Sequence, residues 1–184
     1  LGFRAEATKL VGARAVLTYG ADAFQDRSDN TDSSLTTVTG FGPPQSEAST
    51  RPQVPNASFR SAGVFAQGDV RLADRVSVIV GGRYQDVLAK TRSTPGITDP
   101  PSESKDRTAV GAANLLVRAM PGLNLIASVG RGFRSPNLVE RFFEGPTPEG
   151  SGYQARNPSL DPETSVNVDL GARWRQGVFF AEGF

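Results

Sequence analysis

The clearest pattern in the chain is a strict alternation of apolar and polar positions from Thr164 to Arg175. One parity of this stretch is apolar apart from its first residue, and it reads Thr164, Val166, Val168, Leu170, Ala172 and Trp174. Successive side chains of a strand point to opposite faces, so this pattern predicts a strand with one apolar and one polar face. The stretch is longer than a typical soluble strand of about 5–6 residues.

The same period of two recurs along the chain, whereas helical periodicity is almost absent. The pattern predicts eight strands, over Gly2 to Thr8, Arg14 to Asp26, Ala62 to Leu72, Val76 to Val87, Arg107 to Met120, Leu123 to Phe133, Thr164 to Arg175 and Val178 to Phe184. Residues 27–61 are rich in Ser, Thr, Asn, Asp, Gly and Pro and predict a loop with a little strand at Leu35 to Val38.

The connections between these strands alternate in length. Tight turns near Val11, Asp74, Gly122 and Gly177 alternate with long loops at 27–61, 89–106 and 134–163. In an antiparallel sheet of consecutive strands, this alternation places all tight turns at one end and all long loops at the other. Outer-membrane barrels sort their connections in this way, whereas the Greek-key crossings of soluble sandwiches mix short and long connections at both ends.

Strand length and side-chain size favour the same class. Strands of this length, tilted by about 45°, cover an apolar band about 25 Å tall. The apolar parity contains many small residues, which would fill a sandwich core poorly, and it places Tyr84 and Trp174 where interfacial aromatic residues are expected. We predict an all-β fold: an antiparallel up-and-down transmembrane β-barrel segment, about eight strands of a larger barrel, with short periplasmic turns and long extracellular loops.

A few residues break the alternation. Phe24, Phe65, Ile79 and Ile126 lie on the parity that would face the barrel interior, and Asp86 lies on the lipid-facing parity. The interior apolar residues need a contact, which a folded plug inside a large barrel would supply and a water-filled pore would not.

Composition excludes several function classes. The chain has 20 basic and 19 acidic residues with a net charge of +1, so no basic surface for nucleic acid is expected. Cysteine and histidine are absent, which removes thiol nucleophiles, His-assisted catalysis and thiolate or imidazole metal sites. We therefore expect no enzyme, catalytic residue, metal site or cofactor. The sequence has no long apolar helix and no signal segment, and its mean hydropathy of −0.31 is compatible with a β-barrel.

Two motifs carry a resemblance to a known family. Residues 132–137 read Gly-Phe-Arg-Ser-Pro-Asn, and residues 157–164 read Asn-Pro-Ser-Leu-Asp-Pro-Glu-Thr, followed by Leu-Gly-Ala-Arg at 170–173. Together with Phe-Ala-Gln at 65–67, Leu-Ala-Asp-Arg at 72–75 and Gly-Arg-Tyr at 82–84, this order resembles the barrel domain of TonB-dependent outer-membrane receptors. The resemblance spans roughly residues 61–175. Ser135 stands where the family more often has alanine, and Asp161 where lysine is common.

The resemblance implies a fragment and its function. Residues 1–184 are expected to be one partial barrel domain with no plug domain, TonB box or closing strand. The family implies TonB-dependent uptake of a scarce ligand such as a ferric siderophore, haem or cobalamin. The resemblance also implies four partners: outer-membrane lipid, a plug domain, the TonB energy-transducing complex and the ligand. The implied location is the outer membrane of a Gram-negative-type bacterium.

Three groups of residues follow as site predictions. Six residues of the polar face are expected to line the lumen, and structural ion pairing is the simpler role for each of them. They are Asp69, Arg71, Arg83, Arg118, Asp169 and Arg173. The long loop at 134–163 is here called the outer excursion. Six residues on or beside it could contact ligand: Phe133, Arg134, Asn137, Glu140, Arg141 and Tyr153. Motif residues expected to shape the loop are Gly132, Pro136, Asn157, Pro158, Pro162 and Glu163.

Two other architectures fit the pattern. A small complete eight-stranded barrel with a structural or adhesive role requires the first and eighth strands to pair. A soluble β-sandwich binding module, perhaps for carbohydrate, requires a second layer over the apolar face.

Overall fold

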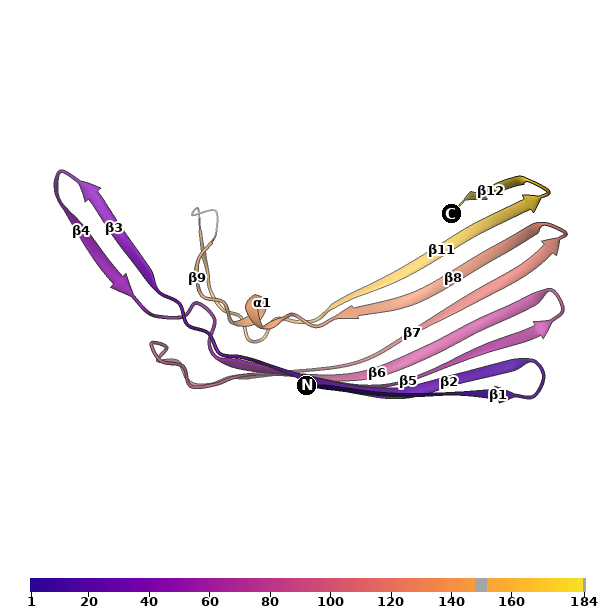
Figure 1. Cartoon of the computed structure of the whole chain (residues 1–184), viewed down its shortest axis with the longest axis horizontal. Coiled ribbons are helices and arrows are strands. Elements are labelled where there is room, and N and C mark those ends of the chain that lie inside the picture. The colour runs from indigo at the N-terminus through magenta and orange to yellow at the C-terminus, as the bar shows by residue number, and fades with distance from the viewer. Residues whose placement is uncertain (148–151, 184) are drawn as a thin grey trace.

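The computed structural model describes residues 1–147 and 152–183 and is dominated by one antiparallel sheet of eight strands (Figure 1). Their order across the sheet follows the chain: β1 (Gly2–Val11), β2 (Ala15–Ser28), β5 (Ala57–Ala73), β6 (Val76–Thr91), β7 (Glu103–Met120), β8 (Leu123–Arg134), β11 (Glu163–Gln176) and β12 (Phe179–Gly183). The all-β, up-and-down prediction is confirmed. The predicted eighth strand ended at Phe184, which lies outside the described residues.

The two ends of the sheet differ as the loop lengths predicted. Short turns join β1 to β2, β5 to β6, β7 to β8 and β11 to β12 at one end, here called the turn end, and long connections occupy the other, here called the loop end (Figure 1). Gly122 shows why one turn needs glycine: its φ is +82°, and a Cβ there would lie 2.2 Å from the backbone oxygen of Arg175.

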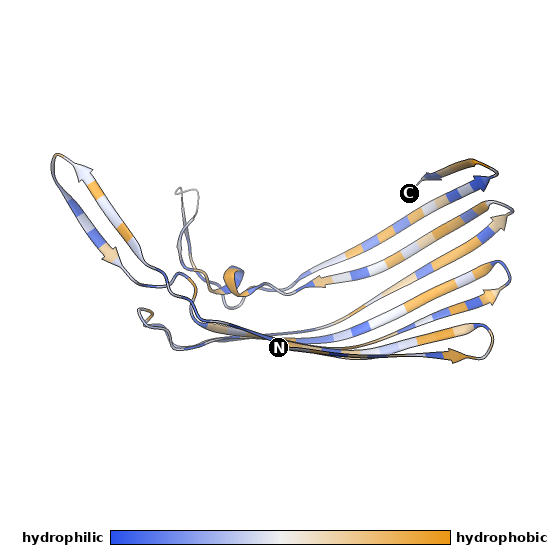
Figure 2. Cartoon of the chain, in the orientation of Figure 1, coloured by the Kyte–Doolittle hydropathy of each residue, from blue (hydrophilic) through white to orange (hydrophobic). Residues whose placement is uncertain are grey.

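The sheet is strongly curved, and its two faces have different chemistry. Residues directly opposed in the antiparallel register share a face, so Val168 lies beside Val129 on the convex side. Val166, Val168 and Leu170 are 71%, 68% and 70% exposed, and hydrophobic residues alternate with polar ones along the strands (Figure 2). Within the part of the chain that the structure describes, no second layer covers this convex face, which contradicts the soluble-sandwich alternative.

The sheet does not close on itself. β1 and β12 are its two edge strands, and the described residues contain no pairing between them. This contradicts the alternative of a complete eight-stranded barrel, which requires that pairing, and agrees with a segment of a larger wall.

The long connections contain elements that the sequence pattern did not predict. The first forms a hairpin of β3 (Ser34–Gly40) and β4 (Gly42–Ser49), longer than the little strand expected at Leu35 to Val38. The third contains α1 (Leu138–Phe142), β9 (Gly145–Pro146) and β10 (Tyr153–Gln154). Helix α1 is too short to show a helical period, and the polar hairpin shows no apolar face.

The buried part of the molecule lies at the loop end. Ala57, Val87, Ala89 and Phe142 are its buried apolar residues, and the first three lie on the concave parity of β5 and β6. Helix α1 lies on this concave side (Figure 1). The outer excursion is thus folded inward onto the wall. None of the helices in the described parts of the chain has both the length and the apolar character needed to cross a membrane.

Candidate functional site

The inward-folded excursion begins with a capped turn of helix. Asn137 is the N-cap of α1: its side-chain oxygen accepts from the Glu140 backbone N–H at 2.9 Å, and the Glu140 carboxylate accepts from the Asn137 N–H at 2.8 Å. This reciprocal capping box satisfies two backbone donors that a helix start leaves free. The hydrogen bond from the Asn137 backbone, together with Arg134, lowers the pKa of the Glu140 carboxyl below its usual value.

Arg141 is the centre of the buried cluster beneath this helix. Its side chain is only 2% exposed and pairs with Asp106 of β7, which is 9% exposed. Its guanidinium also donates to the carbonyl of Pro158 at 3.1 Å and weakly to that of Pro136 at 3.4 Å. The Ser135 hydroxyl donates to Asp106 as well. One buried ion pair therefore joins the strand wall to both arms of the excursion.

Arg134 forms a second, exposed junction between those arms. Its guanidinium binds Glu163 through two nitrogens, at 2.7 and 3.0 Å, and Glu140 at 2.8 Å. Glu163 is the first residue of β11, so this arginine connects the end of β8, helix α1 and the start of β11.

Glu144 connects the excursion to the other long loops. It accepts from Arg51 at 2.9 Å and from the Tyr153 hydroxyl at 3.2 Å, and it pairs with Arg156 at 3.1 Å. Arg156 also pairs with Asp99 of the loop between β6 and β7. The hydrogen bond from Arg51 holds the pKa of the Glu144 carboxyl below its usual value. Glu144 and Arg156 together thus join three connections.

The concave wall carries a polar network of its own. Arg83 binds both oxygens of Asp22, at 2.6 and 2.7 Å, and donates to Gln85 at 2.9 Å. Arg83 lies on β6 and Asp22 on β2, so the pair crosses β5, where Gly63 leaves room: a Cβ there would lie 2.3 Å from the arginine nitrogen. Such a bidentate pair in a partly buried setting fixes the geometry of the wall.

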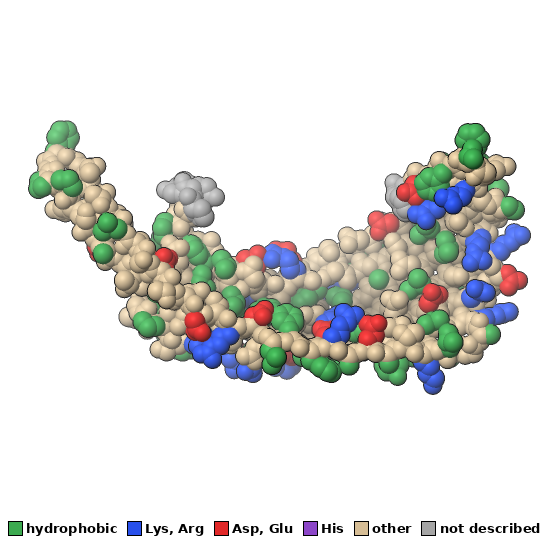
Figure 3. All heavy atoms as spheres, in the orientation of Figure 1, with side chains coloured by type: hydrophobic (Ala, Val, Ile, Leu, Met, Phe, Trp, Pro, Cys, Tyr) green, Lys and Arg blue, Asp and Glu red, His purple; other side chains and the backbone are tan. Residues whose placement is uncertain are grey.

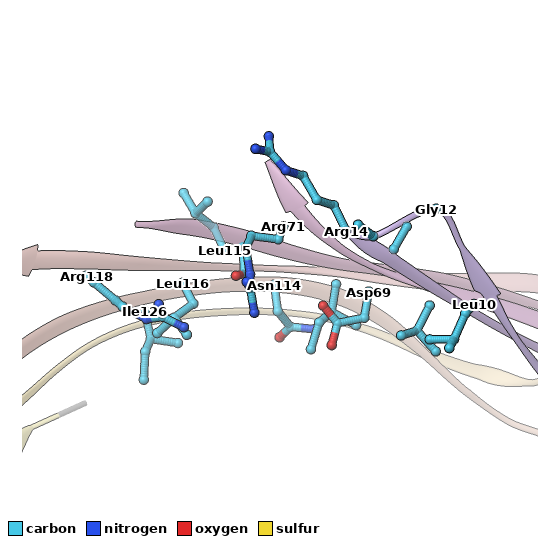
Figure 4. Close-up of a pocket in the computed structure, with 15 residues that line it drawn as sticks. Leu10, Gly12, Arg14, Asp69, Arg71, Asn114, Leu115, Leu116, Arg118 and Ile126 are labelled. Atoms are coloured by element: carbon cyan, nitrogen blue, oxygen red, sulfur yellow. The ribbon is translucent and has the colours of Figure 1, made fainter. Parts of the chain in front are cut away.

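The predicted lumen residues all belong to the concave parity. Asp69, Arg71 and Arg118 line a hollow of about 750 Å³ toward the turn end, together with the apolar Ile79 and Ile126 (Figure 4). The remaining three have partners within the wall: Arg83 pairs with Asp22, Asp169 accepts from Ser128 at 3.1 Å, and Arg173 pairs with Glu182 at 3.0 Å. Their lumen-lining role stays a prediction.

The other residues that broke the alternation also find partners. Phe24 stacks on Phe59 with ring centroids 5.8 Å apart, and the Arg4 guanidinium lies 5.4 Å from the Phe65 ring centroid. Asp86, on the convex side, accepts from Arg107 at 2.8 Å.

The residues predicted to contact ligand are not gathered in one site. Arg134, Glu140 and Arg141 are engaged in the ion pairs above, and Asn137 caps α1. Phe133 pairs with Thr164 and lies on the convex parity, and Tyr153 is 63% exposed on β10. Ligand contact by these residues stays a prediction.

Three of the motif residues, Pro136, Asn157 and Pro158, contact Arg141. Asn157 donates its backbone N–H to the Arg141 carbonyl at 2.8 Å, and its side chain accepts from the Ser159 N–H at 3.1 Å. The Pro158 carbonyl accepts hydrogen bonds from the side chains of both Arg141 and Ser104. At Gly132, a Cβ would lie 2.6 Å from the Ser165 hydroxyl. Pro162 directly precedes β11.

The sequence reasoning missed Asp22, Arg51, Asp106, Glu144 and Arg156, which complete these networks. The pairing of Asp22 with Arg83 could have been found from the alternation of the sequence, because Asp22 lies on the concave parity of β2 and Arg83 lies on the concave parity of β6. Asp106 had no such signal, because its partner Arg141 is 35 positions away in a connection of unknown path.

Comparison with known proteins settles the family. The sequence matches the family model for "TonB dependent receptor-like, beta-barrel" over residues 1–183. The chain belongs to the TonB-dependent receptor family. Members of this family are transporters of the Gram-negative outer membrane, not enzymes. No curated protein sequence matches the chain.

Solved TonB-dependent receptors share the fold. The copper transporter OprC is 22% identical with a TM-score of 0.74, over 98% of this chain and 27% of that one. The hemophore receptor HasR of Serratia marcescens, in complex with its hemophore and heme, is 15% identical with a TM-score of 0.64, over 94% and 29%. The FrpB iron transporter of Neisseria meningitidis is 12% identical with a TM-score of 0.64, over 98% and 26%. The chain thus spans less than a third of these structures.

Proposed function

We propose that this chain is part of the wall of an outer-membrane receptor that takes up a scarce small-molecule ligand, such as an iron chelate, haem or cobalamin, in a TonB-dependent manner. The observation that carries the proposal is the combination of an uncovered apolar convex face with an excursion folded onto the concave face. Lipid would cover the apolar convex face, and the interior of a large barrel would accommodate the excursion. A plug domain inside that barrel would contact the apolar residues of the concave hollow.

The chemistry of this part of the wall favours contact with a chelated or organic ligand over a bare soft metal ion. The chain has no cysteine or histidine and a single methionine, and no group of three or more acidic side chains with metal-site spacing occurs among its described residues. Copper prefers imidazole, thiolate and thioether ligands. Arginines instead recognise carboxylates and other anionic groups on a ligand.

Within this proposal, four of the six loop residues divide into two roles. Arg134, Glu140 and Arg141 hold the excursion in place through their ion pairs, whereas the exposed Tyr153 is the residue best placed to meet a ligand. An aromatic ring with a hydroxyl offers both stacking area and a hydrogen bond.

Paired substitutions on opposite faces of β11 test the proposal in the full-length receptor. Val168→Arg places a charge on the lipid-facing side, and we expect it to abolish membrane assembly and ligand-dependent growth, because a basic residue near mid-membrane costs about 2–4 kcal/mol. Asn167→Arg makes the same change on the concave face and should leave both nearly intact. Equal tolerance at the two positions would contradict the proposal.

A further inference from the structure

Exposed basic side chains gather at the turn end of the sheet (Figure 3). Two of them, Arg14 and Arg75, lie in the turns themselves, and the others lie no more than two residues before the end of a strand. Together they come from the four hairpins of the sheet and are here called the basic edge, which consists of Lys9, Arg14, Arg71, Arg75, Arg118 and Arg175.

Backbone hydrogen bonds fix the spacing of the basic edge. The Arg71 N–H donates to the Arg14 carbonyl at 2.8 Å, and the Arg118 N–H donates to the Arg75 carbonyl at 2.8 Å. A third bond of 2.8 Å ties the Arg175 N–H to the preceding turn. The edge therefore holds two pairs of arginines on neighbouring strands, where like charges repel one another.

Acidic side chains do not neutralise these charges. In the part of the chain that the structure describes, no carboxylate lies within 4.0 Å of a side-chain nitrogen of the basic edge. Asp69 and Asp74 lie at the same end, and Arg118 donates to the backbone carbonyl of Asp74, not to its carboxylate, at 3.2 Å. Glu182 is already paired with Arg173. The edge thus presents an excess of positive charge to a partner.

The extent of the basic edge indicates the kind of anion that fits it. Neighbouring strands lie about 4.8 Å apart, so consecutive hairpins are about 10 Å apart and a small anion would meet only one pair of charges. A folded protein partner would need an apolar centre to its interface, whereas Val11, Met120 and Trp174 at this end lie on the convex parity. An extended polymer with repeated anionic groups matches the arrangement better than either.

The parity of the same residues argues against membrane lipid as the partner. Arg71, Arg118 and Arg175 lie on the concave parity, whereas Lys9 lies on the convex one. Arg14 and Arg75 lie in the turns, beyond the ends of the strands. Most of the basic edge therefore faces the aqueous mouth of the barrel and the compartment beyond it, not the lipid.

We infer that the basic edge binds peptidoglycan, the cell-wall polymer whose peptide stems carry free carboxylates at repeated intervals. A guanidinium binds a carboxylate through two parallel hydrogen bonds. The turns hold the arginine backbones in place before binding, so less conformational freedom is lost when the polymer binds. The inference rests on the proposed placement in the outer membrane, which puts the turn end in the periplasm together with the cell wall.

Co-sedimentation of the full-length receptor, in mild detergent, with purified peptidoglycan sacculi tests the inference. The variant Arg14→Gln/Arg75→Gln/Arg175→Gln removes three charges from three hairpins and leaves the backbone hydrogen bonds of the turns in place. Exposed ion pairs each contribute about 1.4- to fivefold to an equilibrium constant, so this variant should bind sacculi at least about threefold more weakly. The control Arg60→Gln/Lys90→Gln/Lys105→Gln removes three exposed basic residues near the loop end and should bind like the wild type.

Sacculi whose carboxylates have been converted to neutral amides are the second probe. Wild-type binding to them should fall at least as far as binding of the basic-edge variant to native sacculi, because the polymer has lost the groups that the arginines recognise. Membrane assembly and ligand-dependent growth of each variant are measured in parallel.

The outcomes separate this interaction from the proposed function. A wild type that assembles and supports ligand-dependent growth but does not sediment with sacculi overturns the inference alone. Equal loss in the basic-edge and control variants also overturns it, as does equal binding to native and amidated sacculi. Displacement from sacculi by phosphatidylglycerol, an anionic phospholipid, overturns it in favour of the membrane surface. Failure of the wild type to enter membranes overturns both proposals.

Discussion

The loop end and the middle of the wall are stabilised in different ways. At the loop end, β5, β6, β7 and α1 all contribute buried residues, and a buried ion pair joins Asp106 to Arg141. In the middle of the wall, Val64 and Val80 are 56% and 54% exposed, and the polar face carries networks such as Asp22 with Arg83. The loop end therefore holds itself together, whereas the wall depends on its surroundings for the burial of its apolar face.

The largest effect that separates the two regions is expected at Arg141. Arg141→Ala leaves the Asp106 carboxylate buried without its partner, which typically costs about 3–5 kcal/mol. Hydrogen exchange should show faster opening of residues 135–147 and 152–162, with little change in the mid-wall strands. The double variant Asp106→Leu/Arg141→Leu should restore much of the protection. Uniform loss of protection through the wall would contradict a self-contained loop end.

A smaller effect is expected from Gly63→Ala in the wall. The added Cβ would overlap the Arg83 guanidinium and separate it from Asp22, which we expect to cost about 1–3 kcal/mol. Thermal unfolding in detergent measures the loss. Gly68→Ala is the matched control on the same strand, since the nearest heavy atom to its Cβ lies 3.9 Å away. If both variants unfold at the same temperature, the Arg83 network does not stabilise the wall.

The smallest effect concerns pH and the three-loop junction at Glu144. Its pKa in the folded state is lowered by Arg51, so its contribution is present at neutral pH and is lost as the pH falls below the usual value of 4.5. Hydrogen exchange in residues 50–56 should rise on acidification through this range, by the equivalent of about 0.2–1 kcal/mol. Glu144→Gln should show raised exchange already at neutral pH and a weaker response. An unchanged pH response in this variant would assign the effect to other carboxyls.

These differences also explain what the sequence could predict. The eight strands were predictable because β11, for example, keeps its period of two between an apolar and a polar face from Val166 to Arg175. The β3–β4 hairpin was not, since its pairs, such as Thr36 with Glu47, leave no apolar face to read. Helix α1 is shorter than the window in which a helical period becomes visible.

The networks of the site were predictable only where secondary structure sets the geometry. Asp22 and Arg83 sit on regular strands, so their shared face follows from parity. Arg141 and Glu144 lie in the excursion, whose inward path depends on long-range ion pairs with Asp106 and Arg51. Sequence spacing alone gives no access to such contacts.

The most direct test of the central claim, that hydrocarbon contacts the convex face, is spin-label accessibility along β11 of the full-length receptor in lipid bilayers. Labels at positions 166, 168 and 170 should be accessible to oxygen and shielded from a water-soluble relaxant, whereas labels at 165, 167 and 169 should not show this preference for oxygen. A period of two in this ratio is the predicted result. Access of the water-soluble relaxant to both sets, or shielding of both sets from both reagents, would contradict the account.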